Sequence, residues 1–565
     1  MLPSECSKGP WSTGGWSRRP FLRCHAPAVR LLARSVALPL ALLLALLAAP
    51  GMVAAQQPDS ALPARIDRVF AVFDSTTPGC GVGVSRNGQP LYIHAYGMAN
   101  LEYGVPNTDS TVFESGSIAK QFTASDLVLL AQDGKLSLDD DIRTYLPEVP
   151  DFGGQRITIR NLLTHTSGLR DQWGLLGIEG RGPGTQVHTL ATTLDLVAHQ
   201  RMLNFPPGSA YVYSNTGYAL AAIIIQRVSG QSLQAFTQER LFRPLGMTHT
   251  RWRDDYTEIV KNRATAYRGS RAVGFHQDMP FTDMVGNGGV LSTMADLLRW
   301  NANLDAPRVG GAAYVQALET PMRLTNGRTL SYALGLAVGP YEGVPEVSHS
   351  GSTAGYRSFM ARYPDQHVAV AVWCNDAGAN PTALARQVAD LVLVKPARTA
   401  TQAGAPKQRP PAAELARWAG VYRDARTDRA LALAASDSVH LPRGAVSFRG
   451  ARPHREIVVV APDDDTLRLE EVAPPPPVIP LHDYTGTYAS DELDVLFAVA
   501  IRDGRLVLRR RPADELELRP VYADDFTTRS ELGSVRFARD ERGRVTGFSF
   551  FAGRVLDVRF RKIAN

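Results

Sequence analysis

Apolar residues recur at helical spacing between Phe113 and Gly134, a stretch that reads FESGSIAKQFTASDLVLLAQDG. The members of this apolar stripe are Ile118, Phe122, Val128, Leu129 and Ala131. Such a period predicts a helix with one face buried in the core. Ser115 stands where a helix start can be capped, and Gly134 stands where a left-handed C-terminal residue is favoured. The pattern therefore predicts a largely buried helix over this stretch.

The segments around this helix alternate between strand-like and helix-like patterns. Strands are predicted at 81–85, 90–96, 358–363 and 367–373, with a hairpin signal, Arg86-Asn87-Gly88, between the first two. Helices are predicted at 138–145, 158–163, 218–227, 294–303 and 385–392. A long loop rich in glycine and polar residues is predicted at about 170–186. Strands at both ends with helices between them predict an α+β domain, an antiparallel sheet flanked by helices.

The pattern changes after residue 395. The stretch 401–413, TQAGAPKQRPPAA, has the composition of a linker. Beyond it, short alternating runs and turns predict a smaller all-β barrel or sandwich domain, in two halves separated by Pro474–Pro477. The predicted organisation is a leader at 1–55, an α+β domain at 65–395, a linker at 396–411 and a β-rich domain at 412–565.

The first 55 residues have the composition of an export signal. They contain six basic residues and one acidic residue, which give +5 of the formal net charge of +6. The apolar run 36–49 is followed by Val53 and Ala55, which fit signal cleavage after Ala55. We expect a signal peptide, a periplasmic or secreted location and no stable membrane span, with a retained N-terminal anchor as the alternative. The near-neutral remainder argues against a nucleic-acid partner.

Cysteine and histidine are too sparse for a metal centre. Beyond the leader the chain has only Cys80 and Cys374, and its twelve histidines include no His-Glu-x-x-His spacing. We therefore expect no metal and no cofactor. In an exported chain these two cysteines can form one disulfide, but they cannot form a disulfide-rich scaffold.

Ser117 and Lys120 could act as a nucleophile and its base at the start of the predicted helix. A separation of three residues places their side chains on the same face. A serine hydroxyl becomes a strong nucleophile when a neighbouring base takes its proton. A lysine can be that base once burial or positive potential lowers its pKa from about 10.4 towards neutrality. By itself Ser-x-x-Lys is a weak signal, because it also fits a capping serine beside a solvated lysine.

Two further segments place polar groups that such a serine needs. Tyr213-Ser214-Asn215 stands just before a predicted helix; its phenol can relay a proton beside a lysine, and its amide can hold a substrate carbonyl. His349-Ser350-Gly351-Ser352 precedes a strand, and its small residues let a substrate backbone approach closely. The glycines of 286–289 allow similarly close packing.

In this order and at this spacing, the chain resembles the class C branch of the serine β-lactamase and penicillin-binding-protein family over about residues 65–395. The three family motifs, Ser-x-x-Lys, Tyr-x-Asn and Lys-Thr-Gly or its variants, match at Ser117–Lys120, Tyr213–Asn215 and His349–Gly351. The stretch 163–169 also looks like one common in the family. The C-terminal part is similar, more weakly, to the lipocalin-like domains that some members append.

The resemblance implies acyl transfer through a covalent serine ester. Lys120 and Tyr213 would share the removal of the proton from Ser117, which attacks an ester, D-amino-acid peptide or β-lactam carbonyl. The backbone N–H groups of Ser117 and Ser352 would hold the oxyanion. Asn215 would orient Lys120 and the substrate amide. The implied partner is thus a small-molecule or peptide substrate.

The third motif departs from the pattern of the lactamases. Its implied substrate-binding residues are His349, Ser350, Gly351 and Ser352. Where the lactamases carry a lysine that helps hold the substrate's carboxylate, His349 carries a charge that depends on pH. If His349 meets a carboxylate as imidazolium, turnover of anionic substrates should fall above about pH 6.5. The change argues against true β-lactamase activity and leaves peptidase and esterase activity open.

Three alternatives remain open. His165 could be a catalytic base, although the family uses its stretch structurally and a structural role is favoured. The whole chain could be a catalytically silent protein that binds peptidoglycan-like peptides. The main function could also belong to the C-terminal domain as a ligand or partner module.

The resemblance also implies a disulfide. In the family the first strand pairs antiparallel with the last strand of the same sheet, which here are 81–85 and 367–373. That pairing would bring Cys80 and Cys374 together, within the range a disulfide bridges. Two buried free thiols are the alternative.

Overall fold

The computed structural model describes residues 60–396, 412–427, 430–433, 445–451, 454–460, 466–511, 514–528 and 532–564. The expected signal peptide and nearly all of the expected linker lie outside the described residues, so the domain boundaries drawn there stay predictions. In the part that is described, no helix has the length and apolar character needed to cross a membrane.

A six-stranded antiparallel sheet forms the centre of the first region, in the order β10-β11-β12-β13-β1-β2. Its strands are β1 (Cys80–Arg86), β2 (Gln89–Tyr96), β10 (Ala337–Tyr341), β11 (Val344–Thr353), β12 (Tyr356–Tyr363) and β13 (Val368–Cys374). The chain thus enters and leaves the sheet on neighbouring strands. The four strands predicted from the sequence are confirmed.

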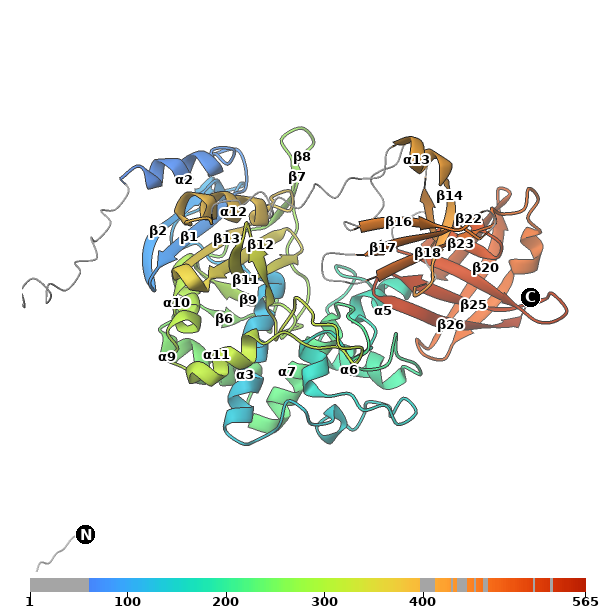
Figure 1. Cartoon of the computed structure of the whole chain (residues 1–565), viewed down its shortest axis with the longest axis horizontal. Helices are drawn as coiled ribbons and strands as arrows, with labels where there is room; N and C mark the ends of the chain where they lie inside the picture. Colours follow the sequence, from blue (N-terminus) through green and yellow to red (C-terminus); the bar gives the residue numbers. More distant parts are fainter. Residues whose placement is uncertain are drawn as a thin grey trace, which may run out of the picture. The chain divides into compact units, whose positions relative to one another are not determined.

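Helices cover both faces of this sheet, which explains why β13 is apolar at every position (Figure 1). Val368, Val370 and Val372 pack with α2 (Leu62–Phe70) and α12 (Pro381–Val392). The alternate residues, Ala371 and Trp373, belong to the larger core on the other face. On that side α10 (Met294–Asp305) lies against β1 and β13.

The second half of the region is mainly helical. Its helices and helical turns are η1 (Gly116–Ala119), α3 (Lys120–Gln132), η2 (Ile142–Thr144), α4 (Ile159–Leu163), α5 (Gln172–Ile178), α6 (Leu190–His199), α7 (Asn215–Ser229), α8 (Leu233–Thr237), η3 (Gln238–Phe242), α9 (Arg243–Leu245) and α11 (Gly311–Glu319). The turn η4 (Pro364–Gln366) instead joins the sheet strands β12 and β13. Its short strands are β3 (Met98–Asn100), β4 (Val105–Pro106), β5 (Phe113–Glu114), β6 (Arg251–Trp252), β7 (Tyr267–Ser270), β8 (Gly274–Gln277) and β9 (Val290–Ser292).

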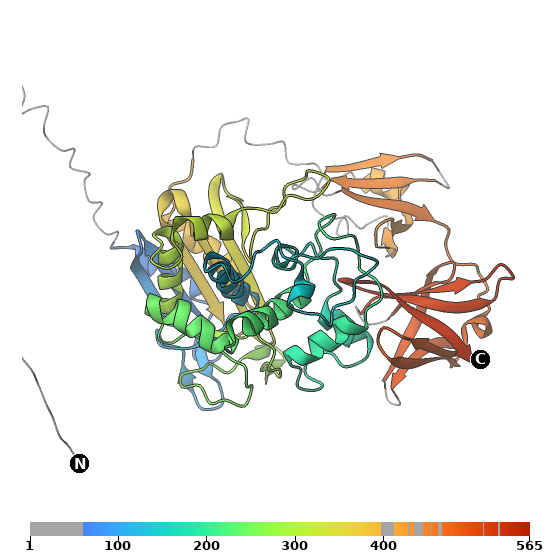
Figure 2. The same cartoon turned by 90° about the horizontal axis from the view of Figure 1, so that it is seen from below.

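Helix α3 lies in the middle of this half, as Figure 2 shows. Every residue from Lys120 to Leu130 is buried, so the predicted largely buried helix is confirmed, and its burial extends beyond the single apolar stripe. The expected cap is wrong: Ser115 makes no cap hydrogen bond, because its hydroxyl donates to the carbonyl of Gly116. A 3-10 turn begins the helical segment, and Gly134 ends it with a φ of 68°.

The predicted loop at 170–186 contains a helix, α5, which corrects the sequence interpretation. Asp171 caps its start by accepting from the backbone N–H groups of Trp173 and Gly174. Leu175, Leu176 and Ile178 of α5 belong to the same apolar cluster as the core of the C-terminal barrel. The helix was missed because its apolar partners lie about 300 residues away in the sequence.

Among its described residues, the C-terminal part is β apart from the short helix α13 and the turn η5, as predicted. A five-stranded sheet has the order β15-β14-β18-β17-β16, and eight strands, β19 to β26, form a closed barrel (Figure 1). The bounds are α13 (Ala412–Arg417), β14 (Gly420–Asp424), β15 (Ala430–Leu433), β16 (Ala445–Arg449), β17 (Glu456–Val460), β18 (Thr466–Val472), η5 (Leu481–Tyr484), β19 (Gly486–Ser490), β20 (Val495–Arg502), β21 (Arg505–Arg511), β22 (Asp514–Tyr522), β23 (Asp525–Thr528), β24 (Ser534–Arg539), β25 (Val545–Ala552) and β26 (Val555–Ala564).

The first and last strands of the six-stranded sheet along the chain are linked covalently. The register of β1 against β13 places Cys80 opposite Cys374, with their Cα atoms 4.0 Å apart. The structure has a disulfide between these two buried residues. The predicted antiparallel pairing of the two strands is confirmed.

Candidate active site

Lys120 lies at the start of α3 with its amine enclosed by protein. Its Nζ is 3.2 Å from Ser117 Oγ, 2.9 Å from Asn215 Oδ1 and 2.7 Å from the backbone oxygen of Asn287. The 3-10 turn η1 carries Ser117, and the start of α7 carries Asn215. Two of the predicted motifs, Ser117–Lys120 and Tyr213–Asn215, therefore meet at one amine.

The partners of Lys120 determine where its lone pair points when the amine is neutral. Amide and carbonyl oxygens only accept hydrogen bonds, so Asn215 and Asn287 take both hydrogens of a neutral amine. The lone pair is then left to face the Ser117 hydroxyl. Burial lowers the pKa of Lys120 well below its usual value, which favours this neutral form. The geometry suits Lys120 to accept the proton of Ser117.

Tyr213 is the second group beside the nucleophile. Its ring lies 4.9 Å from Lys120 Nζ and 4.1 Å, between centroids, from the ring of His165. Burial raises the pKa of Tyr213, and a hydrogen bond with Ser117 offsets part of this rise. Tyr213 is thus a neutral phenol at neutral pH, a form that can donate a proton but does not readily take one.

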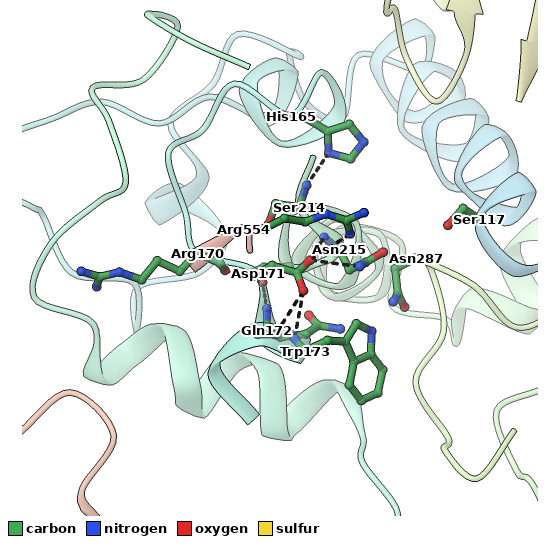
Figure 3. Close-up of polar contacts among 12 residues, drawn as sticks. Ser117, His165, Arg170, Asp171, Gln172, Trp173, Ser214, Asn215, Asn287 and Arg554 are labelled. Carbon is green, nitrogen blue, oxygen red and sulfur yellow. Dashed lines mark hydrogen bonds and ion pairs between the residues drawn. The ribbon is translucent and has the colours of Figure 1, made fainter. Parts of the chain in front are cut away.

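A buried carboxylate orients the amide of Asn215 (Figure 3). Asp171 Oδ2 accepts from the backbone N of Asn215 at 2.7 Å and from its Nδ2 at 3.0 Å. Because Nδ2 is directed to Asp171, Oδ1 must face Lys120. The same carboxylate caps α5 through its other oxygen, Oδ1, which is 3.1 Å from Trp173 N. One side chain thus links the helix α5 to the catalytic amine.

Strand β11 passes unusually close to the nucleophile's turn. A Cβ on Gly351 would lie 2.0 Å from the backbone oxygen of Ser115 and 3.0 Å from Ser117 N, and a Cβ on Gly116 would lie 2.5 Å from Ser352 N. Only glycine at these two positions allows the approach. The backbone N atoms of Ser117 and Ser352, the two groups of the predicted oxyanion hole, therefore both lie where β11 meets the turn of the nucleophile.

His165 and His349 are joined through Tyr332 by hydrogen bonds whose directions are determined. The backbone N–H of Ser214 donates to His165 Nδ1, so Nε2 of a neutral His165 carries the hydrogen and donates to Tyr332 Oη at 3.2 Å. His349 Nδ1 donates to the carbonyl of Ser350, so its Nε2 accepts from Tyr332 Oη at 2.9 Å. Every donor in this series of hydrogen bonds, from Ser214 to Ser350, has an acceptor when both imidazole rings are neutral.

His349 therefore does not carry the expected charge. Burial lowers the pKa of His349 to about 4, and the nearby Lys120 adds to this shift. The predicted change of charge near pH 6.5 is wrong, because a desolvated ring that accepts from Tyr332 gains nothing from a proton there. Burial also lowers the pKa of His165 well below its usual value, which agrees with a structural role in holding Ser214.

These residues surround a cavity of about 800 Å³. Ser117, Tyr213, Asn215 and 349–352 all contribute to its wall. Its charged lining residues are Glu114, Arg253, Asp278 and Arg554. Groups of three or more His, Cys, Asp or Glu side chains able to hold a metal do not occur within the described residues.

The site also contains residues that the sequence interpretation did not single out. Asp171 precedes the helix α5, which the sequence interpretation treated as loop. Asn287 accepts from Lys120 through its backbone carbonyl, and any residue type could supply that group. Arg554 lies about 340 residues from Tyr213 in the sequence, in a β domain with no motif of its own. Sequence offered a signal for Asn287 alone, through its glycine-rich surroundings, 286–289.

Comparison with known proteins gives consistent results. The sequence model of the family described as Beta-lactamase matches residues 66–395. A D-aminopeptidase of Cereibacter sphaeroides strain KD131 is 29% identical over 496 residues, which cover 83% of this chain and 93% of that protein. A penicillin-binding protein of Bacillus subtilis strain 168 is 33% identical over 303 residues, covering 50% of this chain and 64% of that protein.

The fold has a solved counterpart. The octameric penicillin-binding protein homologue from Pyrococcus abyssi matches with a TM-score of 0.52 and 23% identity, over 83% of this chain and 97% of that one. At this identity the likeness shows the fold alone. The family match covers more than half of the 565 residues. The chain is a serine hydrolase and belongs to the beta-lactamase family.

Proposed function

We propose that this protein hydrolyses amide bonds formed by D-amino acids, through an acyl ester on Ser117. The observation that carries the proposal is the enclosed amine of Lys120, whose two obligate acceptors direct its lone pair to Ser117 Oγ. The relative named D-aminopeptidase, which aligns over most of both chains, supports D-amino-acid substrates.

The mechanism follows from the protonation states of the two bases. Lys120 takes the proton of Ser117 as Oγ attacks the carbonyl carbon, and the backbone N–H groups of Ser117 and Ser352 stabilise the oxyanion. Tyr213, a neutral phenol, gives its proton to the leaving nitrogen. The Lys120 ammonium then reprotonates Tyr213. Lys120, neutral again, takes the proton of a water molecule that attacks the acyl ester, and it returns this proton to Ser117 Oγ as the acid is released.

The test compares matched substrates on the full chain. Hydrolysis of D-alaninamide should exceed that of L-alaninamide, and Ser117→Ala should abolish it while the thermal unfolding curve is retained. A fluorophosphonate probe should label Ser117 in peptide mapping. An adduct on another serine, or equal rates for both enantiomers, would contradict the proposal.

We also propose that the protein is exported to the periplasm or secreted. The signal-like composition of 1–55 supports this location, and so does the Cys80–Cys374 disulfide, since such bonds persist in oxidising compartments. Fractionation of expressing cells should find the mature chain outside the cytoplasm, beginning near residue 56. Retention of the full-length chain in the cytoplasmic fraction would reject the idea.

A further inference from the structure

The usual cation of the third motif is missing from this site. His349 stands in its place, and its Nε2 accepts a hydrogen bond from Tyr332, so the ring offers no positive charge. The guanidinium of Arg253 is taken by Glu114 at 2.9 and 3.0 Å. Lys120 is enclosed among its three acceptors. These groups leave an anionic substrate without a cationic partner.

Arg554 is a further cation in the same cavity, and its charge partner, Asp171, lies at the distance limit of an ion pair. Its guanidinium carbon lies 4.5 Å from the centre of the Tyr213 ring, and Nη1 is 3.9 Å from Asp171 Oδ2 (Figure 3). That separation is too long for a hydrogen bond, and both oxygens of Asp171 already accept from backbone or amide groups. Within the described residues, the guanidinium makes no hydrogen bond. The side chain is 48% exposed.

The turn that carries Arg554 is held firmly against the catalytic region. Arg554 lies between β25 and β26, and residues 61–565 form one compact unit. Asn204 makes two hydrogen bonds with this turn. Its Nδ2 donates to the carbonyl of Arg554 and its Oδ1 accepts from Leu556 N, both at 2.9 Å. Arg170 donates to the carbonyls of Leu556 and Asp557 at 2.9 and 3.0 Å.

The next residue of the turn is fixed by packing. Val555 is fully buried, and a Cβ on Gly174 of α5 would lie 2.5 Å from its Cγ2. Arg170 is itself fully buried and forms an ion pair with Glu492 of the barrel. Arg554 is thus a cationic side chain on a turn that these contacts hold in place, and a recognition residue needs such support.

We infer that Arg554 binds the carboxylate of the substrate's leaving group, so that the C-terminal barrel supplies the anion-binding site that the third motif lacks. The inference rests on the proposed function. In the proposed mechanism Tyr213 protonates the leaving nitrogen and must therefore contact it. Because Arg554 lies over the Tyr213 ring, its guanidinium is placed beside the leaving group that carries this nitrogen. Guanidinium donors pair with carboxylates in two parallel hydrogen bonds.

The substrate class follows from this placement. The preferred substrate is a D-aminoacyl amide whose leaving group is an amino acid with a free carboxylate, one residue beyond the cleaved bond. A dipeptide of two D-amino acids is the smallest example. The same compound with its carboxylate converted to an amide loses the partner of Arg554 and nothing else.

The test pairs D-alanyl-D-alanine with its C-terminal amide. In the full chain, Arg554→Ala should lower kcat/KM for the dipeptide roughly 10- to 100-fold, the range for a lost hydrogen bond to a charged group, mainly through KM. The amide should change less than threefold. Arg554→Lys should retain part of the preference, and Arg554→Glu should reverse it. Arg561→Ala, which removes a charge at an exposed position of β26, the strand that follows Arg554, is the matched control.

A second measurement separates this inference from the proposed function. Binding of the two compounds to Ser117→Ala and to Ser117→Ala/Arg554→Ala can be measured by calorimetry without turnover. Hydrolysis of D-peptides with equal effects of Arg554→Ala on both compounds would overturn the carboxylate site and leave the proposed function intact. Carboxylate-dependent binding with no hydrolysis of any D-peptide would overturn the proposed function and keep the site.

Discussion

At the residue scale, burial assigns different tasks to two neighbouring bases. It lowers the pKa of Lys120 and raises that of Tyr213, so both groups are neutral at neutral pH. A neutral amine accepts a proton and a neutral phenol donates one. The expectation that both share the removal of the Ser117 proton is thereby refined: Lys120 acts on the nucleophile and Tyr213 on the leaving group.

This division predicts different substrate dependence for two substitutions. Lys120→Ala should slow acylation by any substrate roughly 100-fold or more, the usual size of a general-base effect. Tyr213→Phe should slow amides by a similar factor but activated esters far less, because a good leaving group needs no proton. Stopped-flow acylation rates for a D-aminoacyl amide and its 4-nitrophenyl ester would measure both. Tyr211→Phe, whose ring also contacts His165, is the control. Equal losses on both substrates in Tyr213→Phe would contradict the assignment.

His349 predicts a pH dependence of stability. Its pKa in the folded protein, about 4, lies below the value of about 6.5 in the unfolded chain. The unfolded state therefore binds the proton more readily, and the contribution of His349 is complete above pH 6.5 and is lost as the pH falls towards 4. We expect a loss of roughly 2 kcal/mol between pH 7 and pH 5 that His349→Asn does not show. Urea unfolding at the two pH values measures it, with the exposed His276→Asn as control. The same pH loss in His349→Asn as in the parent would contradict the shifted pKa.

The sequence predicted the residues whose roles depend on local spacing. Ser117 and Lys120 are three residues apart, and Tyr213 and Asn215 are two apart, so short motifs carry them. Asp171 and Arg554 act only through the fold. Neither their types nor their neighbours in the sequence distinguish them from any surface carboxylate or guanidinium.

At the scale of elements, helices and strands were predicted correctly where their own residues show a clear apolar periodicity. The helices predicted at 158–163 and 294–303 are found as α4 and α10, and Thr158 and Thr293 cap their starts. The helix α5 was not predicted, because its own sequence does not indicate a helix. Its sequence, QWGLLGI, contains two glycines, which disfavour a helix. Packing against the barrel and the Asp171 cap supply the stability that its composition lacks.

The two glycines of α5 provide a matched pair for testing this packing. Gly174→Ala places a methyl group 2.5 Å from Val555 Cγ2, whereas Gly177→Ala meets only the end of Leu532 at 3.3 Å. Both changes improve helix propensity by about 1 kcal/mol, and overpacking a buried site costs about 1–3 kcal/mol. Gly174→Ala should therefore be less stable than Gly177→Ala by roughly 1–3 kcal/mol in denaturant unfolding. Equal stability of the two variants would show that α5 does not depend on the turn that carries Arg554.

At the scale of the whole molecule, the fold class could be predicted but the junction of its parts could not. Strands at both ends with helices between them indicated the α+β region, and short alternating runs indicated the β-rich region. The ion pair of Arg170 with Glu492 joins residues 322 positions apart. Such a pairing leaves no periodic signal, because each partner is an ordinary charged residue in its own segment.

A disulfide links the two ends of the catalytic region. Cys80 and Cys374 are separated by 294 residues, so the disulfide closes most of that region into one loop. In the chain-entropy model, a loop of this length raises the free energy of unfolding by roughly 5 kcal/mol, as an upper value, since residual structure in the unfolded chain reduces it.

A thiol assay on protein purified without reductant and then denatured should find no free thiol in the mature chain. Cys80→Ala/Cys374→Ala should unfold at lower denaturant concentration than the oxidised parent, and at nearly the same concentration as the reduced parent, because two alanines are accommodated where two buried thiols were. Two free thiols per mature chain would refute the bridge, and oxidised and reduced parents with equal stability would mean that the loop is already constrained by the pairing of β1 with β13.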